Sequence, residues 1–202
     1  KASRHCYLLE SANQTEVWGR YSFLGYEPVM EITCTDGYMK IRHTEVGNDE
    51  VVTKQVAHPG DTLREILKEY KSPVMEEMPP FTGGLVGYFS YDYIKYSEPK
   101  LKLGEHEDPD FRDMDLMLFD QVIAFDHYRQ KVLLITGVML DDLEKSYQKA
   151  EKKLQEMADL IRDGEKEEFP SLKLASEIKP QFPKEKYCDM VEKAKHYIHE
   201  GD

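Results

Sequence analysis

The sequence lacks long apolar runs and an excess of positive charge. Its 202 residues include 27 Lys plus Arg against 39 Asp plus Glu, a formal net charge of −12. No stretch of about 18 uncharged apolar residues occurs, so we expect no membrane-spanning segment. Generic nucleic-acid binding needs a basic surface that displaces the counterions of the phosphates, and this composition does not provide one. We therefore expect neither a membrane nor a nucleic acid among its partners.

Cysteine is also scarce. The three cysteines, Cys6, Cys34 and Cys188, are far apart, odd in number and not in CxxC spacing. This usage is typical of a reducing compartment, in which thiols act as small apolar side chains. We therefore expect a cytoplasmic protein without structural disulfides. Aromatic and β-branched residues are plentiful, which predicts a folded core rather than disorder.

The first half of the chain has the pattern of β-strands. Residues 29–34 and 38–42 flank Asp36-Gly37, and an Asp-Gly step between such runs predicts a hairpin. Residues 17–24 and 51–56 are further strand candidates.

A short helix and a second hairpin follow. We predict a helix capped by Asp61 and stopped by Pro73. The nearly continuous apolar run 116–125 predicts one central strand, paired with 132–138 across a turn at 127–130.

The pattern changes to a helical period after Asp141. Apolar residues at three- and four-residue steps predict a long amphipathic helix, followed by a charged linker. A last helix begins near Pro183 and ends at Gly201. Its apolar stripe either packs on the body of the protein or faces a partner that this chain does not contain; the pattern leaves both readings open. The stripe comprises Tyr187, Met190, Val191, Ala194, Tyr197 and Ile198.

Several familiar site patterns fail their tests. The glycines at 83, 84 and 87 suggest a phosphate loop, but no Gly-Lys-Ser/Thr follows them, and glycines in an apolar strand more often allow a close approach of another chain segment. The acidic loop around His106 matches no metal motif, and His196 and His199 fit solvated helix positions. We find no catalytic residue by pattern and predict no metal site in this chain.

One strand end has a more specific composition. The run Leu8-Leu9-Glu10-Ser11 ends in a carboxylate and a hydroxyl, and Arg20 opens the next strand nine positions after Ser11. Glu10 could accept an ammonium group, while Ser11 and Arg20 could bind polar or carboxylate groups of a zwitterionic ligand. The alternative is an ordinary strand end with a solvated glutamate and a surface arginine.

Four blocks of sequence resemble the N-terminal part of anthranilate synthase component I, and they occur in family order. The blocks are LLES with GRYSFLGYEP, PPFTGGLVGYFSYD, DPDFRDMDLMLFDQVIAFDH, and FPKEKYCDMVEKAKHYIHEGD. The resemblance covers nearly the whole chain. It implies an α+β fold in which antiparallel β-sheets pack orthogonally with flanking helices.

The resemblance also implies a function for the full-length protein. Members of that family convert chorismate and ammonia to anthranilate and pyruvate, using Mg²⁺ and a glutamine amidotransferase subunit, component II. The implied domains are a regulatory domain at 1–163, a linker at 164–182, and the first helix of a truncated chorismate-binding domain at 183–202. The family's catalytic and metal motifs follow the Glu-Gly-Asp at which this sequence stops, so we expect this fragment to be inactive alone and to hold no cofactor itself.

In that family the N-terminal part binds tryptophan as a feedback inhibitor. Carried over by position, Glu10 and Ser11 would line the effector pocket, Leu9 would form an apolar wall, and Arg20 would stand nearby. Because the pocket is shared with the C-terminal domain, the fragment should bind tryptophan weakly. Two alternatives remain: aminodeoxychorismate synthase component I, and a free-standing effector-binding or interaction module.

Overall fold

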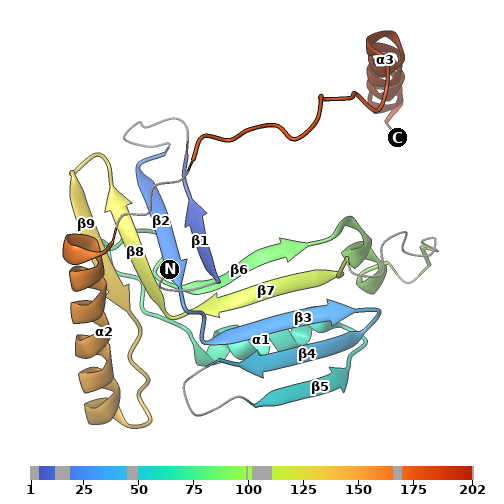
Figure 1. Cartoon of the computed structure of the whole chain (residues 1–202). Helices are drawn as coiled ribbons and strands as arrows, with labels where there is room; N and C mark the ends of the chain where they lie inside the picture. Colours follow the sequence, from blue (N-terminus) through green and yellow to red (C-terminus); the bar gives the residue numbers. More distant parts are fainter. Residues whose placement is uncertain are drawn as a thin grey trace. The chain divides into compact units, whose positions relative to one another are not determined.

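A computed structural model describes residues 5–11, 19–44, 50–98, 100–101, 111–165 and 170–201. The chain divides into two units, Lys1–Gly164 and Glu165–Asp202. The first unit contains two antiparallel sheets and two long helices, drawn from blue to orange in Figure 1. In the second, residues 165 and 170–201 are described and contain a single helix. The predicted α+β class with antiparallel sheets is confirmed.

The larger sheet has five strands in the order β5-β4-β3-β7-β6. The strands are β3 (Met30–Thr35), β4 (Tyr38–His43), β5 (Val51–Gln55), β6 (Gly84–Phe89) and β7 (Met114–Phe119). The predicted hairpin is confirmed, because β3 pairs with β4 across Asp36 and Gly37. Both turn residues have positive φ, 49° and 79°, as the tight turn of a two-residue hairpin requires.

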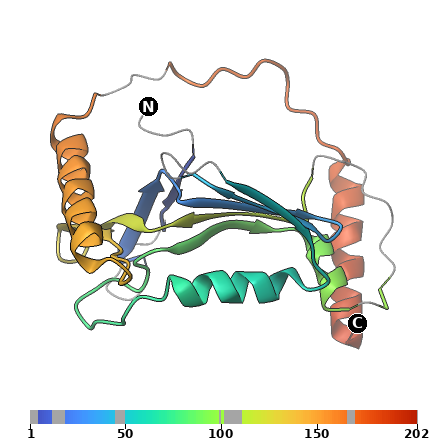
Figure 2. The same cartoon turned by 90° about the horizontal axis from the view of Figure 1, so that it is seen from below.

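Helix α1 (Pro59–Glu69) covers one face of this sheet, as Figure 2 shows. Leu63 and Ile66 of α1 pack against the buried side chains of β3, β4 and β7, which form the main core. The helix begins two residues before Asp61, with His58 at the N-cap, so the predicted capping role of Asp61 is wrong. Proline fits the first turn of a helix because its missing N–H has no partner there.

The smaller sheet has four strands in the order β1-β2-β8-β9. These are β1 (Cys6–Leu9), β2 (Tyr21–Tyr26), β8 (Gln121–Asp126) and β9 (Lys131–Thr136). The hairpin of β8 and β9 across 127–130 is confirmed. The expected strand at 17–24 is β2, and its residues 17 and 18 lie outside the described residues.

The apolar run 116–125 does not form one strand, which corrects the sequence prediction. It is divided at Asp120 into β7 of the larger sheet and β8 of the smaller one. In Figure 1 the strands of one sheet run across the direction of the other. Bends at which a strand changes sheets make the corners of such arrangements. Hydrophobicity predicted the burial of the run but could not reveal the corner within it.

A short 3-10 helix, η1 (Tyr91–Tyr96), follows β6 in the first unit.

Two longer helices follow the last strand. Helix α2 (Leu143–Asp163) lies beside β9 and buries Ala150 and Met157. Helix α3 (Lys184–Glu200) belongs to the second unit and buries none of its residues, so its apolar stripe stays exposed there. None of the described helices combines the length and the apolar character needed to cross a bilayer.

Candidate functional site

The predicted ligand residues of β1 are accessible. Leu9 closes the strand and is 46% exposed, and Glu10 and Ser11 follow it as exposed residues. Neither Glu10 nor Ser11 forms a side-chain hydrogen bond with another residue in the described part of the chain. A carboxylate and a hydroxyl are therefore presented next to an apolar side chain.

Behind this strand end lies a series of aromatic rings. Leu9 is paired with Phe23 of β2, so the two side chains share one face of the smaller sheet. The Phe23 ring stacks on Tyr21 at 5.8 Å and meets Phe81 edge-on at 5.6 Å. Leu9, which alone was predicted to form an apolar wall, thus borders an aromatic surface that β2 and a loop build together.

The series continues into the core through Tyr7. Its ring contacts Phe81 at 6.2 Å and Phe119, at the end of β7, at 4.7 Å. It lies directly over Gly25, where any Cβ would overlap the ring. Burial raises the pKa of Tyr7 to about 12. The base of the aromatic surface is therefore fixed to the corner between the two sheets.

Arg20, the fourth predicted residue, is held by Asp126 at the end of β8. Its Nε donates to Oδ1 at 3.0 Å and its Nη2 donates to Oδ2 at 2.6 Å. The hydrogen bonds from Arg20 hold the pKa of Asp126 at about 2, and the same pairing raises the pKa of Arg20. Arg20 is therefore not the loose surface cation of the alternative interpretation. Its partner, 106 positions away, was not predicted from the sequence.

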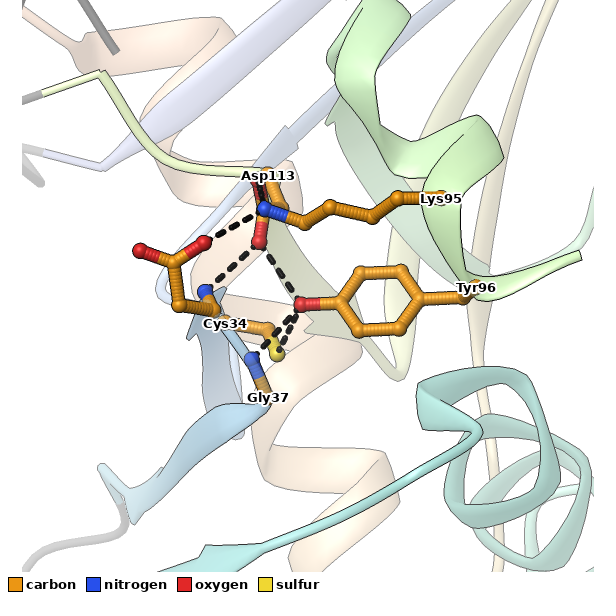
Figure 3. Close-up of polar contacts among 6 residues, drawn as sticks. Cys34, Gly37, Lys95, Tyr96 and Asp113 are labelled. Atoms are coloured by element: carbon orange, nitrogen blue, oxygen red, sulfur yellow. Dashed lines mark hydrogen bonds and ion pairs between the residues drawn. The ribbon is translucent and has the colours of Figure 1, made fainter. Parts of the chain in front are cut away.

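A second charged cluster lies at one end of the larger sheet (Figure 3). Asp113, fully buried before β7, accepts from the Tyr96 hydroxyl and from the Asp36 backbone N–H, each at 2.7 Å. Lys95 bridges Asp113 at 2.9 Å and Asp36 at 2.6 Å. The Tyr96 oxygen also accepts from the Gly37 N–H at 2.7 Å. The cluster fastens η1 to the β3–β4 turn.

The hydrogen bonds of this cluster favour the charged forms of Asp113 and Lys95. Burial alone would raise the pKa of Asp113, but the hydrogen bonds from Lys95 and Tyr96 outweigh it and lower the pKa. Burial would lower the pKa of Lys95, but its bonds to Asp113 and Asp36 raise it. Burial and the bond to Asp113 raise the pKa of Tyr96. Only the Asp-Gly turn of this cluster could have been found in the sequence.

The glycine cluster has a structural role. Gly84 and Gly87 belong to β6, and a Cβ on Gly87 would overlap the carbonyl oxygen of Asp115 in the neighbouring β7. Close approach of two strands therefore explains this glycine, as the strand interpretation predicted. The geometry gives no support to a phosphate loop.

The described residues contain no group of three side chains suited to a metal ion. His196 lies 3.5 Å from Glu200 on the surface of α3. His106 and its acidic neighbours lie outside the described residues. The described part of the chain therefore offers no candidate ligand set for Mg²⁺.

Comparisons with known proteins agree with one another. A sequence model of the family described as chorismate binding enzyme matches residues 4–202. Anthranilate synthase component 1 of Acinetobacter calcoaceticus is 34% identical over 97% of this chain and 39% of its own length. Aminodeoxychorismate synthase component 1 of Bacillus subtilis is 32% identical over 100% of this chain and 41% of its own length.

A solved structure shares the fold. The crystal structure of anthranilate synthase component I from Streptococcus pneumoniae has a TM-score of 0.62 and 29% identity, covering 98% of this chain and 41% of that one. The chain thus spans about two fifths of the length of the relatives it matches.

Proposed function

The chain belongs to the chorismate binding enzyme family, and on that premise we propose that it is the tryptophan-feedback part of an anthranilate synthase component I. The whole protein would be a lyase that converts chorismate and ammonia to anthranilate and pyruvate in tryptophan biosynthesis. Its ammonia would come from glutamine through an amidotransferase partner, component II.

The observation that carries the proposal is the composition of one strand end. An aromatic and aliphatic surface, formed by Leu9, Phe23 and Tyr21, borders two accessible polar residues, Glu10 and Ser11. An indole ring fits an apolar wall, and an ammonium group fits a free carboxylate. L-Tryptophan combines these groups in one molecule.

Feedback inhibition would follow from linkage. A ligand that binds one arrangement of the protein more tightly than another shifts the population toward the first. If tryptophan binds best to an arrangement that disfavours chorismate, then chorismate weakens tryptophan binding by the same factor. The Mg²⁺ of the reaction would be bound outside the residues described here.

The test is Ser11→Phe in the full-length gene product. The bulky ring should fill the polar end of the pocket and raise the tryptophan concentration needed for half-inhibition by about tenfold or more, since each 1.4 kcal/mol of lost binding is about tenfold. Anthranilate formation without tryptophan should be unchanged. Ser72→Phe, at another exposed serine, is the matched control and should leave inhibition as it is. Unchanged inhibition in Ser11→Phe would refute the effector site.

A second candidate is aminodeoxychorismate synthase component I, which the Bacillus subtilis relative favours at 32% identity. The two functions differ in product. Incubating the gene product with chorismate, Mg²⁺ and ammonia and separating the products by chromatography distinguishes them. Aminodeoxychorismate without anthranilate would overturn the first proposal.

A further inference from the structure

The guanidinium group of Arg20 is bound along one edge only. Asp126 engages Nε and Nη2, which form the side of the group. A guanidinium group carries N–H donors on all three of its nitrogens, so the end formed by Nη1 and Nη2 keeps donors of its own. No acceptor for Nη1 is present among the residues that the structure describes.

Both carboxylate oxygens of Asp126, the partner of Arg20, already accept hydrogen bonds. The Asp126 Oδ1 also accepts the backbone N–H of Arg129 at 3.0 Å, and Asp126 is only 3% exposed. A buried carboxylate whose two oxygens are both occupied cannot swing toward solvent. Asp126 therefore acts as a fixed support rather than as a ligand group.

Two aromatic rings restrict the guanidinium further. Its central carbon lies 4.8 Å from the ring centre of Tyr21 and 5.6 Å from that of Tyr128. Such cation–π contacts and a bidentate carboxylate together define both the position and the plane of the group. The Arg20 side chain remains 24% exposed, so a ligand can approach it.

The support also places Arg20 beside the aromatic surface of the candidate site. Asp126 is paired with Tyr21 across β8 and β2, and Tyr21 stacks on Phe23, the partner of Leu9. A cation thus follows directly on the series of rings. This arrangement suits a ligand that carries an aromatic group and a carboxylate a short distance apart.

We propose that Asp126 is a positioning residue that fixes Arg20 so that its free end receives the carboxylate of the effector amino acid. The inference rests on the proposed effector site and adds what selects its ligand. Arg20 binds the carboxylate of the ligand. Asp126 holds the guanidinium group in the orientation in which Nη1 and Nη2 can both donate to that carboxylate. The bound effector would therefore be distinguished from its uncharged amide at this end of the site.

The test compares three ligands by calorimetry on the full-length gene product: L-tryptophan, L-tryptophan amide and indole-3-propionate, which has the carboxylate but no ammonium group. The variants are Asp126→Asn, which keeps the shape but removes the charge, and Arg20→Lys, which keeps the charge but loses the fork. Asp115→Asn is the matched control, because it removes an aspartate from an exposed ion pair with Arg112 at 2.6 Å on the other sheet.

We expect the wild type to bind tryptophan about tenfold or more tightly than the amide, because hydrogen bonds between charged groups are worth more than neutral ones. Asp126→Asn and Arg20→Lys should each weaken tryptophan and indole-3-propionate by about tenfold and leave the amide unchanged. Asp115→Asn should affect none of the three. A merely structural ion pair would weaken all three ligands together, so the ratio of tryptophan to amide affinity isolates the positioning role.

The outcomes separate this inference from the proposed function. Tryptophan binding with the same amide ratio in Asp126→Asn as in the wild type overturns the positioning role and leaves the effector site standing. Binding of indole-3-propionate that depends on Asp126, without tryptophan binding, overturns the effector and retains the carboxylate site. If no carboxylate binds the wild type, both are refuted. If Asp126→Asn fails to fold, the ratio of tryptophan to amide affinity in Arg20→Lys tests the carboxylate contact instead, and an unchanged ratio there overturns the inference.

Discussion

The two sheets each carry a charged cluster at a strand end, and the clusters differ in how completely their donors and acceptors are used. In the larger sheet, Asp113, Lys95 and Tyr96 bind one another and the turn at Asp36 and Gly37. In the smaller sheet, Asp126 occupies one edge of Arg20 and leaves the other.

This difference separates architecture from recognition. A buried carboxylate surrounded by its own donors stabilises the local structure and has little to offer a ligand. A cation that is fixed along one edge and still 24% exposed can bind an anion without first being oriented, which lowers the cost of binding. The predictions below test whether the first cluster serves stability and the second serves binding.

Asp113→Ala should have the largest effect on stability. It leaves Lys95, the Tyr96 hydroxyl and the Asp36 N–H without their shared acceptor, and removing one partner of a buried pair is strongly destabilising, here about 3 kcal/mol. The free energy of unfolding from urea titration measures it. The ratio of tryptophan to amide affinity should be unchanged.

The matched control for that change is Asp115→Ala, two positions further along the chain in β7. Its ion pair with Arg112 is exposed, and exposed pairs contribute below about 1 kcal/mol. Equal losses in the two variants would contradict the claim that burial makes the Asp113 cluster structural.

Tyr96→Phe should have an intermediate effect. It keeps the ring that contacts Tyr93 at 5.2 Å but removes the hydroxyl that donates to Asp113 and accepts from Gly37. A lost hydrogen bond that leaves a partly buried partner unsatisfied costs about 1 to 2 kcal/mol. Hydrogen exchange at the Gly37 amide should also become faster. An unaltered free energy of unfolding would show that the hydroxyl is not needed.

The effect of Asp126→Asn on stability should depend on pH. The folded-state pKa of Asp126 is about 2, below the ordinary value of 3.8, so its stabilising contribution is present above pH about 4 and is lost as the pH falls through about 2. The wild type should therefore exceed the variant in stability at pH 7, and the gap should close between pH about 4 and about 2. Urea titrations across this range measure the gap, and a constant gap would contradict the ion pair.

Much of the fold could be predicted because its signals are local. The Asp-Gly hairpin, the turn at 127–130 and the helices α2 and α3 were found from turn residues and helical periodicity. The divided run at Asp120 and the early start of α1 were not. The corner between the sheets depends on how the segment packs, which hydrophobicity along the chain does not record. Pro59, by contrast, is a local signal for a first helical turn that the prediction overlooked.

The candidate site shows the same division. Leu9, Glu10 and Ser11 were singled out because they are contiguous and chemically distinct. Phe23 and Phe81 were missed as members of the site, since only strand register brings Phe23 to Leu9 and only a returning loop brings Phe81 to Phe23. No pattern in the sequence connects Arg20 with Asp126 or Lys95 with Asp113.

The sequence by itself determined both hairpin turns, the helices α2 and α3, the lack of net positive charge and the family resemblance, because these depend on composition and on neighbours along the chain. Only the tertiary structure decided which charges are satisfied and which remain available. The physical reason is that a hydrogen bond needs its donor and acceptor within about 3 Å. In this protein that proximity is set by the pairing of strands more than one hundred residues apart, as it is for Arg20 and Asp126.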